Sequence, residues 1–358
     1  MRVIGCLSGT SLDGIEIAAA DLTLEDGKLL TRPLGSRSEP YPGGLRGDLE
    51  AALPPARTSA AALCRLDALV GQAFADAADR ANEALCEGAA ELVVSHGQTV
   101  FHWVEDGHAR GTLQVGQPAW IAERLGVPVV SDLRSRDIAA GGHGAPLVAL
   151  FDVLLLGSAP DTRGALNLGG IANVTIIPGA GDPIAFDVGP GNALIDAAVT
   201  HLSGGAERLD EGGRRAARGS IDEPLLNRLL SDPYYALQAP KSTGKEHFHL
   251  HYLLEALSER PAIGGDDVLA TVTELTGRTV GDVCRRHDVA ELVVSGGGSR
   301  NATLLASIAR AAPGTVLRRS DDYGIPSHAK EAYAFAVLGF LTVHGLTGSL
   351  PSCTGARA

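Results

Sequence analysis

The feature that most constrains the fold of this chain is a repeated pentapeptide. Glu-Leu-Val-Val-Ser occurs at residues 91–95 and again at 291–295, and each copy is followed by a glycine-containing turn. A short apolar run that ends in a glycine turn is typical of a buried strand. A five-letter match can arise by chance, but the same position in each half of the chain indicates two duplicated α/β domains. A length of 358 residues also favours about two domains.

The N-terminal stretch, residues 3–21, reads as a β-hairpin. Residues 3–7 are apolar, residues 8–14 are rich in Gly, Ser, Thr and Asp, and apolar side chains then recur at every second position. The turn has backbone N–H groups and the hydroxyls of Ser8, Thr10 and Ser11 for phosphate oxygens, and Asp13 is a carboxylate suited to Mg²⁺. An ordinary tight turn of the same composition is the alternative.

Further junctions between strands and glycine turns follow along the chain. Residues 165–177 read as strand, glycine turn and strand, and Phe186–Asn192 ends a strand with Asp187 followed by a glycine turn. The strand at 91–95 is expected to end at Ser95–Thr99, and the strand at 127–132 to run into a loop at 132–144. Apolar spacings of three and four predict helices at 59–87, 119–125, 193–202, 223–230, 249–257, 266–286, 301–311 and 330–343.

Composition excludes several classes of function. A net charge of −12 disfavours a nucleic-acid surface, although a small anionic substrate needs only a local Arg or Lys. The five cysteines are scattered and form no C-x-x-C pair, which predicts neither a disulfide framework nor a zinc site. No run approaches the ~20 apolar residues of a membrane span, and the N-terminus lacks the pattern of a leader. We therefore expect a cytoplasmic protein that binds neither nucleic acid nor membrane.

Four local patterns mimic known sites and are rejected. Residues 239–246 resemble a phosphate-binding P-loop, but Ala239 and Glu246 replace its required Gly and Ser/Thr. The segment at 189–194 lacks the third glycine of a dinucleotide fingerprint. No Cys or acidic cluster accompanies the alternating histidines at 247, 249 and 251, and a surface position is favoured over a metal site. Ser95 and His96 are adjacent on a strand, point to opposite faces, and lie in no G-x-S-x-G elbow.

The remaining glycine junctions lie in two similar α/β halves, as in the sugar kinase, hexokinase and actin superfamily. In several short sequence segments, which occur in the same order, the chain resembles bacterial anhydro-N-acetylmuramic acid kinases. Matching strings run along the whole chain: Ser8–Gly14, Ser95–Thr99, Asp132–Leu147, Asn167–Asn173, Phe186–Asn192, Pro240–Gly244 and Ser295–Gly298. The chain departs from the family pattern at Glu16, Gln117, His143 and Val188, where the family has Asp, Asp, Gln and Thr. Val188 removes a hydroxyl beside the candidate base.

The resemblance implies an α/β fold with two duplicated ribonuclease H-like domains of the actin/hexokinase type around a central ATP cleft. The expected domains are residues 1–131 with 332–358, and residues 132–331. The implied reaction opens the 1,6-anhydro ring of 1,6-anhydro-N-acetylmuramic acid with water, phosphorylates O6 with ATP, and serves peptidoglycan recycling. ATP, Mg²⁺ and a homodimer belong to the same expectation.

Site residues are carried over position by position. Asp187 is the expected general base, since it leaves a strand end toward the cleft; a cap of the helix that begins near Asn192 is the alternative. Glu331 resembles the second carboxylate of the family and orients water or sugar; its alternative is an ordinary first-turn Glu. An Arg at 134 or 136 is expected to clamp the lactyl carboxylate, with Arg136 preferred. The expected sugar contacts are His96, Gln98, Arg136 and Asn192. Nucleotide contacts are expected at Gly9, Thr10, Ser11, Leu12, Asp13, Gly14, Ile15, Glu16, Gly169, Gly170, Gly296, Gly297 and Gly298, with Asp13 also the metal ligand.

Three other functions remain open from sequence. An ordinary sugar kinase of the same fold would phosphorylate a free hydroxyl with a single Asp base. A carbohydrate sensor without catalysis is disfavoured because Asp13, Asp187 and the glycine turns are all present. A phosphoanhydride hydrolase of the same superfamily is the third alternative.

Overall fold

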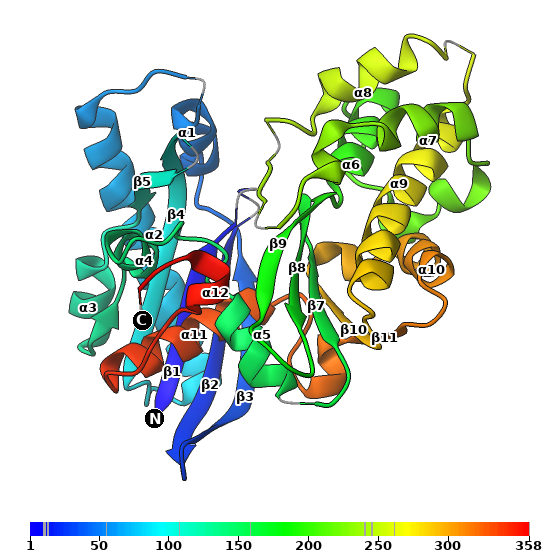
Figure 1. The fold of residues 1–358 in the computed structure, drawn as a ribbon. Helices are drawn as coiled ribbons and strands as arrows, with labels where there is room; N and C mark the ends of the chain where they lie inside the picture. The colour runs from blue at the N-terminus through cyan, green and yellow to red at the C-terminus, as the bar shows by residue number, and fades with distance from the viewer. Residues whose placement is uncertain are drawn as a thin grey trace. The chain divides into compact units, whose positions relative to one another are not determined.

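The computed structural model describes residues 1–9, 12, 14–54, 56–106, 108–157, 159–239, 241–244, 246–260 and 262–357. Its contacts divide the chain into two units (Figure 1). Unit 1 comprises Met1–Leu155 and Gly324–Ala358, and unit 2 comprises Leu156–Tyr323. The chain therefore leaves unit 1, forms unit 2, and returns to complete unit 1.

Unit 1 is built on a mixed sheet. Its path is β3-β2-β1-β4-β5, and β6 pairs with β4 beside this path. The β1–β2 and β2–β3 pairs are antiparallel, whereas β4 runs parallel to both β1 and β6. The predicted N-terminal hairpin is thus confirmed, with Leu7 opposite Glu16 at its end. The strands are β1 (Arg2–Ser8), β2 (Ile15–Glu25), β3 (Lys28–Glu39), β4 (Leu92–Glu105), β5 (His108–Val115) and β6 (Val129–Val130).

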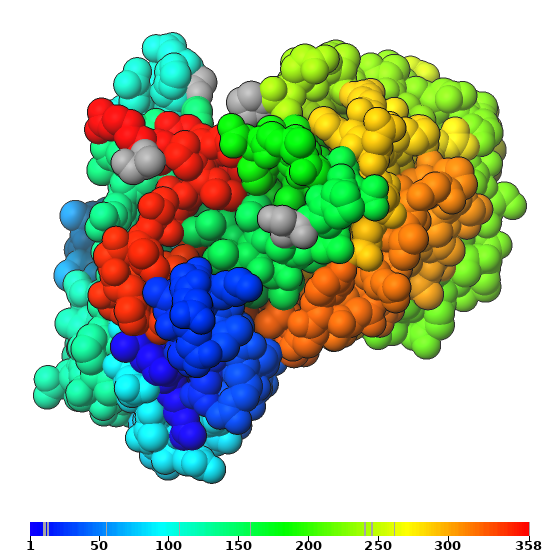
Figure 2. All heavy atoms as spheres, turned by 60° about the horizontal axis from the view of Figure 1, so that its bottom comes forward, coloured from blue at the N-terminus to red at the C-terminus, as the bar shows by residue number. Residues whose placement is uncertain are grey.

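Helices cover both faces of this sheet. The long helix α2 (Ala60–Cys86) packs on one face, and α11 (Lys330–Val343) packs on the other. The close approach of α11 requires Gly5, because a Cβ there would meet the backbone carbonyl of Ala332. Figure 2 shows the C-terminal residues in red beside the first strands in blue. The other helices of this part are α1 (Leu45–Ala52), α3 (Ala119–Leu125), α4 (Leu133–Ala139), α5 (Ala149–Leu156) and α12 (Pro351–Thr354).

Unit 2 is built on a second mixed sheet, of order β11-β10-β7-β8-β9. The β7–β8 and β8–β9 pairs are antiparallel, and β10 runs parallel to both β7 and β11. The strand order and directions repeat those of β3-β2-β1-β4-β6 in unit 1. One Glu-Leu-Val-Val-Ser copy comprises Glu91 and the first four residues of β4, and the other copy is the whole of β10. The two strands occupy the same place in their sheets. The strands are β7 (Arg163–Leu168), β8 (Ile171–Ile177), β9 (Ile184–Pro190), β10 (Glu291–Ser295) and β11 (Val316–Arg319).

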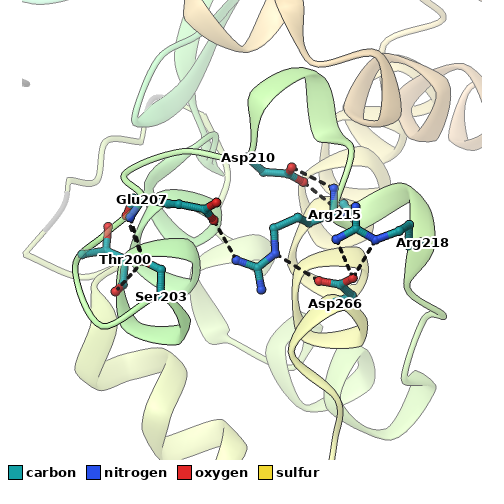
Figure 3. A network of polar contacts seen from close by, with 8 residues as sticks. Thr200, Ser203, Glu207, Asp210, Arg215, Arg218 and Asp266 are labelled. Atoms are coloured by element: carbon teal, nitrogen blue, oxygen red, sulfur yellow. Dashed lines mark hydrogen bonds and ion pairs between the residues drawn. The ribbon is translucent and has the colours of Figure 1, made fainter.

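The helices of unit 2 form two apolar clusters, one against the sheet and one among the helices themselves. A charged network ties the segment at 207–218 to the start of α9 (Figure 3). Arg215 donates to Glu207 and to Asp266 at 3.1 and 3.0 Å, and Asp210 accepts two backbone N–H groups. The α-helices are α6 (Ala193–Leu202), α7 (Glu223–Leu230), α8 (Leu250–Leu257), α9 (Gly265–Arg286) and α10 (Ala302–Ala311). Short 3₁₀ turns are η1 (Glu211–Gly213), η2 (Ala216–Arg218), η3 (Pro233–Ala236), η4 (Gly297–Arg300) and η5 (Ser320–Tyr323).

The structure corrects two local predictions. The strand predicted to end at Ser95–Thr99 continues to Glu105, because Gly97, with φ of 66°, lies at a bulge rather than in a turn. The predicted loop at 132–144 contains α4. The described part of the chain contains no helix that is both long and apolar enough to span a membrane.

Candidate active site

The structure describes three of the predicted nucleotide contacts in the N-terminal loop, namely Gly9, Leu12 and Gly14. Leu12 donates its N–H to the carbonyl of Gly9 at 3.2 Å, which closes the loop. Gly14 lies so close to Glu39 that a Cβ there would meet its carbonyl oxygen. Thr10, Ser11 and Asp13 lie outside the described residues, so their predicted contacts to phosphate and metal stay predictions. Ile15 and Glu16 begin β2 and pair with β3.

His96 and Gln98, the predicted sugar contacts of unit 1, lie inside β4. The His96 ring stacks on Phe335 of α11, with 4.3 Å between centroids. Burial, aided by the nearby Arg134 guanidinium, lowers the pKa of His96 well below its usual value, so the ring is neutral. Gln98 is 1% exposed and accepts a hydrogen bond from the Tyr41 hydroxyl at 3.3 Å.

The two candidate arginines lie on α4 but in different surroundings. Arg136 is exposed. Arg134 is largely covered, donates from Nη1 to Thr99 Oγ1 at 3.0 Å, and has a buried Nε with no hydrogen-bond partner. Burial lowers the pKa of Arg134, and the charge of Glu331 partly opposes that effect. A guanidinium keeps its charge even so, which leaves Arg134 with an unused N–H donor.

Glu331 lies in the first turn of α11, as its alternative reading also predicted. Part of the residue remains accessible, yet burial of its carboxyl raises the pKa of Glu331. The positive charges of Lys330 and Arg134 oppose this effect, and the negative charge of Asp152 adds to it. A poorly solvated carboxyl on which charges of both signs act is suited to exchange protons or to bind polar groups of a ligand.

Asp187, the predicted base, lies on β9 opposite Asn173 of β8. Its Oδ2 accepts the N–H of Thr243 at 2.9 Å, and its backbone carbonyl accepts the Tyr234 hydroxyl at 2.7 Å. The carboxylate is therefore bonded away from α6, whose N-cap residue Asn192 makes no side-chain cap. Burial raises the pKa of Asp187 to about 6, although the Thr243 N–H stabilises the charged form.

The residue after the candidate base points the other way. Val188 is 2% exposed and belongs to the apolar core of unit 2, as does Phe186. Because side chains alternate along a strand, Asp187 faces away from this core. The hydroxyl that Val188 lacks would therefore project into the core and not beside the Asp187 carboxyl.

The predicted glycine turns of unit 2 interlock. The N–H of Asn192 donates to the carbonyl of Gly169 at 2.9 Å, and its side-chain amide donates to Leu168 O at 3.1 Å. A Cβ at Gly298 would meet both Leu168 and Asn192. The structure thus brings together the turns that contain Gly169–Gly170, Asn192 and Gly296–Gly298.

Several neighbours of these groups had no role in the sequence predictions. They are Thr99 beside Arg134, Tyr234 and Thr243 beside Asp187, and the ion pair of Lys330 with Asp152. Thr243 lies in a string that carried the family resemblance, so a signal for it existed in the sequence. Across the described ranges, no group of three or more His, Cys, Asp or Glu side chains is arranged to hold a metal ion.

Comparison with known proteins identifies full-length relatives. The family model described as anhydro-N-acetylmuramic acid kinase matches residues 1–358. An anhydro-N-acetylmuramic acid kinase of Streptomyces coelicolor is 62% identical over 357 residues, which is 100% of this chain and 91% of the relative. Relatives with the same description from Rhodococcus erythropolis and Salinibacter ruber are 55% and 40% identical, over 100% and 99% of this chain and 92% and 94% of their own lengths.

Proposed function

The chain belongs to the anhydro-N-acetylmuramic acid kinase family, and we propose that it converts 1,6-anhydro-N-acetylmuramic acid, ATP and water into N-acetylmuramic acid 6-phosphate and ADP. The observation that carries the proposal is 62% identity over the whole chain to a relative of that description. The substrate is a fragment of the cell wall, so the reaction serves peptidoglycan recycling.

The chemistry needs a base because O6 of the substrate is locked in an internal glycosidic bridge. A water molecule adds to C1 and loses a proton, the C1–O6 bond breaks, and O6 attacks the γ-phosphorus of ATP as ADP leaves. Asp187 accepts the proton of the water. Its pKa of about 6 leaves it largely ionised at neutral pH, yet close enough to neutrality to take a proton.

The surroundings of Asp187 support this role. The Thr243 N–H and the Tyr234 hydroxyl fix the carboxyl and its backbone at 2.9 and 2.7 Å. Lys241 donates to the Tyr234 carbonyl at 3.2 Å and lies over the Tyr234 ring. Its positive charge lowers the pKa of Asp187, but this effect is smaller than the rise that burial causes. The carboxyl is thus held rigidly without being neutralised by a close ion pair.

Substrate binding in unit 1 is assigned to Arg134 in preference to Arg136. The free Nε of Arg134 and the planar fork of its guanidinium suit the lactyl carboxylate of the sugar. Arg136 has an exposed side chain and remains the alternative clamp. Glu331 orients the water or the sugar. His96 and Gln98 are proposed to support the sugar-binding side of unit 1 from within β4.

Phosphate binding in unit 2 is assigned to the glycine turns. Gly297 has open space where a Cβ would project, so a phosphate or a nucleoside can approach its backbone. Mg²⁺ neutralises phosphate charge in such transfers. Its predicted ligand Asp13 lies outside the described residues, so this assignment rests on the sequence.

Two duplicated ribonuclease H-like domains are part of the proposal. The support is the shared strand order and the Glu-Leu-Val-Val-Ser copies at equivalent strands. Contacts divide the chain after Leu155 and after Tyr323, and the boundaries proposed from sequence are 131/132 and 331/332. A homodimer and a cytoplasmic location also remain proposals.

One incubation tests the function. The protein is mixed with ATP, Mg²⁺ and the anhydro sugar, and the products are resolved by mass. We expect a product heavier than the substrate by one phosphoryl group and one water, with one ADP per sugar. A product that gained the phosphoryl group alone would indicate an ordinary sugar kinase, and binding without turnover would indicate a sensor. Omission of ATP is the control, because ring opening without phosphorylation would uncouple the two steps.

A further inference from the structure

Unit 1 contains a deeply buried ion pair next to Glu331. Lys330 Nζ lies 2.6 Å from Asp152 Oδ1, and the two residues are 3% and 4% exposed. Among the ion pairs of the described ranges, no other has both side chains so well covered. The pair joins α5 to the first turn of α11, where Lys330 immediately precedes Glu331.

A buried ion pair of this kind adds little net stability to a fold. Removing two charges from water costs several kcal/mol per ion, and an apolar pair of similar volume often stabilises a fold as well or better. Next to the pair, α11 packs through apolar side chains, among them Tyr333 and Phe335. An apolar pair would therefore suit this place, and the charges call for another explanation.

The charged groups that act on Glu331 lie on three helices, one of which is its own helix α11. Lys330 is its neighbour on α11, Asp152 projects from α5, and Arg134 projects from α4. The His96 ring of β4 stacks on Phe335, one turn further along α11, and is neutral. Two positive groups and one negative group thus act on the Glu331 carboxyl.

We propose that Asp152 and Lys330 are positioning residues, which fix the first turn of α11 and set the charge around the Glu331 carboxyl. The inference rests on the proposed role of Glu331 in orienting water or sugar. Without Asp152, Lys330 would add a second full positive charge beside Arg134 and would favour the ionised form of Glu331. Asp152 neutralises Lys330 and so limits the positive charge that acts on the Glu331 carboxyl.

The two halves of the pair act on Glu331 with opposite sign. Asp152→Asn removes the negative charge, leaves Lys330 to Glu331, and lowers the pKa of Glu331. Lys330→Met removes the larger of the two influences and raises the pKa of Glu331, even where Asp152 becomes protonated. The two variants should therefore move the titration of Glu331 in opposite directions.

The test is an NMR titration of the full chain labelled with ¹³C at the Glu side-chain carboxyl. The Glu331 signal is identified by its loss in Glu331→Gln. Glu274→Gln is the matched control, since Glu274 is also a buried carboxylate, bonded to Ser307 at 2.6 Å in unit 2. We expect Asp152→Asn and Lys330→Met to shift the Glu331 titration in opposite directions, and Glu274→Gln to leave it in place. An unmoved titration, or a shift in the same direction for both variants, overturns the proposal.

A double variant separates positioning from folding. Asp152→Leu with Lys330→Met replaces the pair by apolar side chains, and we expect it to unfold in urea at no lower concentration than the wild type. A loosened first turn of α11 should nevertheless lower kcat roughly tenfold to a hundredfold, with a smaller change in the KM for ATP. A stable double variant with wild-type kcat refutes the positioning role. The titration needs no turnover, so its outcome is independent of whether the proposed reaction is observed.

Discussion

Replacement of Asp187 by Asn should abolish turnover and, at the same time, stabilise the fold. The amide keeps the size of the carboxyl and an oxygen that can accept the Thr243 N–H. It cannot accept the proton of the attacking water. Loss of one general base costs roughly a hundred- to ten-thousandfold in rate. Binding of ATP and sugar should persist, because neither depends on proton transfer.

The gain in stability follows from the raised pKa of Asp187. Its pKa is about 6 in the fold against an ordinary value of 3.8, a difference of about two pH units. Each unit is worth about 1.36 kcal/mol, so ionisation costs the folded state up to about 3 kcal/mol. The wild type does not bear this cost below about pH 4, where the group is protonated in both states. It bears the cost fully above about pH 6, and Asn never does.

Urea unfolding of both proteins at several pH values measures this difference. We expect the free energies of unfolding to coincide near pH 4 and the Asn variant to be more stable by up to about 3 kcal/mol near pH 8. Asp182→Asn is the control: its carboxyl is exposed just before β9, so the variant should behave as the wild type. Near-normal turnover of Asp187→Asn would remove Asp187 from the base role. Equal stability at pH 8 would show that its carboxyl is well solvated.

Three further outcomes are expected. The kcat of the wild type should rise from about pH 5 to about pH 7 as Asp187 ionises, and a flat profile in a pH-rate assay would contradict the role of this group. Arg134→Lys should raise the KM for the sugar by roughly tenfold to a hundredfold, which is the contribution of one charge-assisted hydrogen bond. Arg136→Lys should change this KM little. If steady-state kinetics show the reverse order, Arg136 is the residue that binds the lactyl carboxylate. Gly5→Ala should lower the free energy of unfolding by about 1–3 kcal/mol, because its Cβ would press on Ala332 of α11, and unchanged thermal melting would refute that contact.

Elements with a complete local signal were predicted from the sequence. The predicted helix at 193–202 matches α6, and those at 223–230 and 330–343 match α7 and α11 residue for residue. Their apolar residues recur at helical spacing, and Asp222, a side-chain cap, precedes α7. The sequence could not show that β4 passes beyond Gly97, because a glycine bulge and a glycine turn have the same composition.

The candidate site likewise contains residues with a local sequence signal and residues without one. Asp187 was predicted because a carboxylate at a strand end before a glycine turn is a local pattern. The choice between Arg134 and Arg136 is not local: two residues apart on α4, they differ by about 200° around the helix, and only the packing of α4 decides which one reaches Thr99. The Lys330–Asp152 pair joins residues 178 positions apart, so nothing near either residue could indicate it. Strand ends and turns thus indicate the groups that we propose for the chemistry, while the groups that we propose to position them depend on contacts between distant elements. The variants of Asp152 and Lys330 therefore test the part of the site that the sequence alone could not supply.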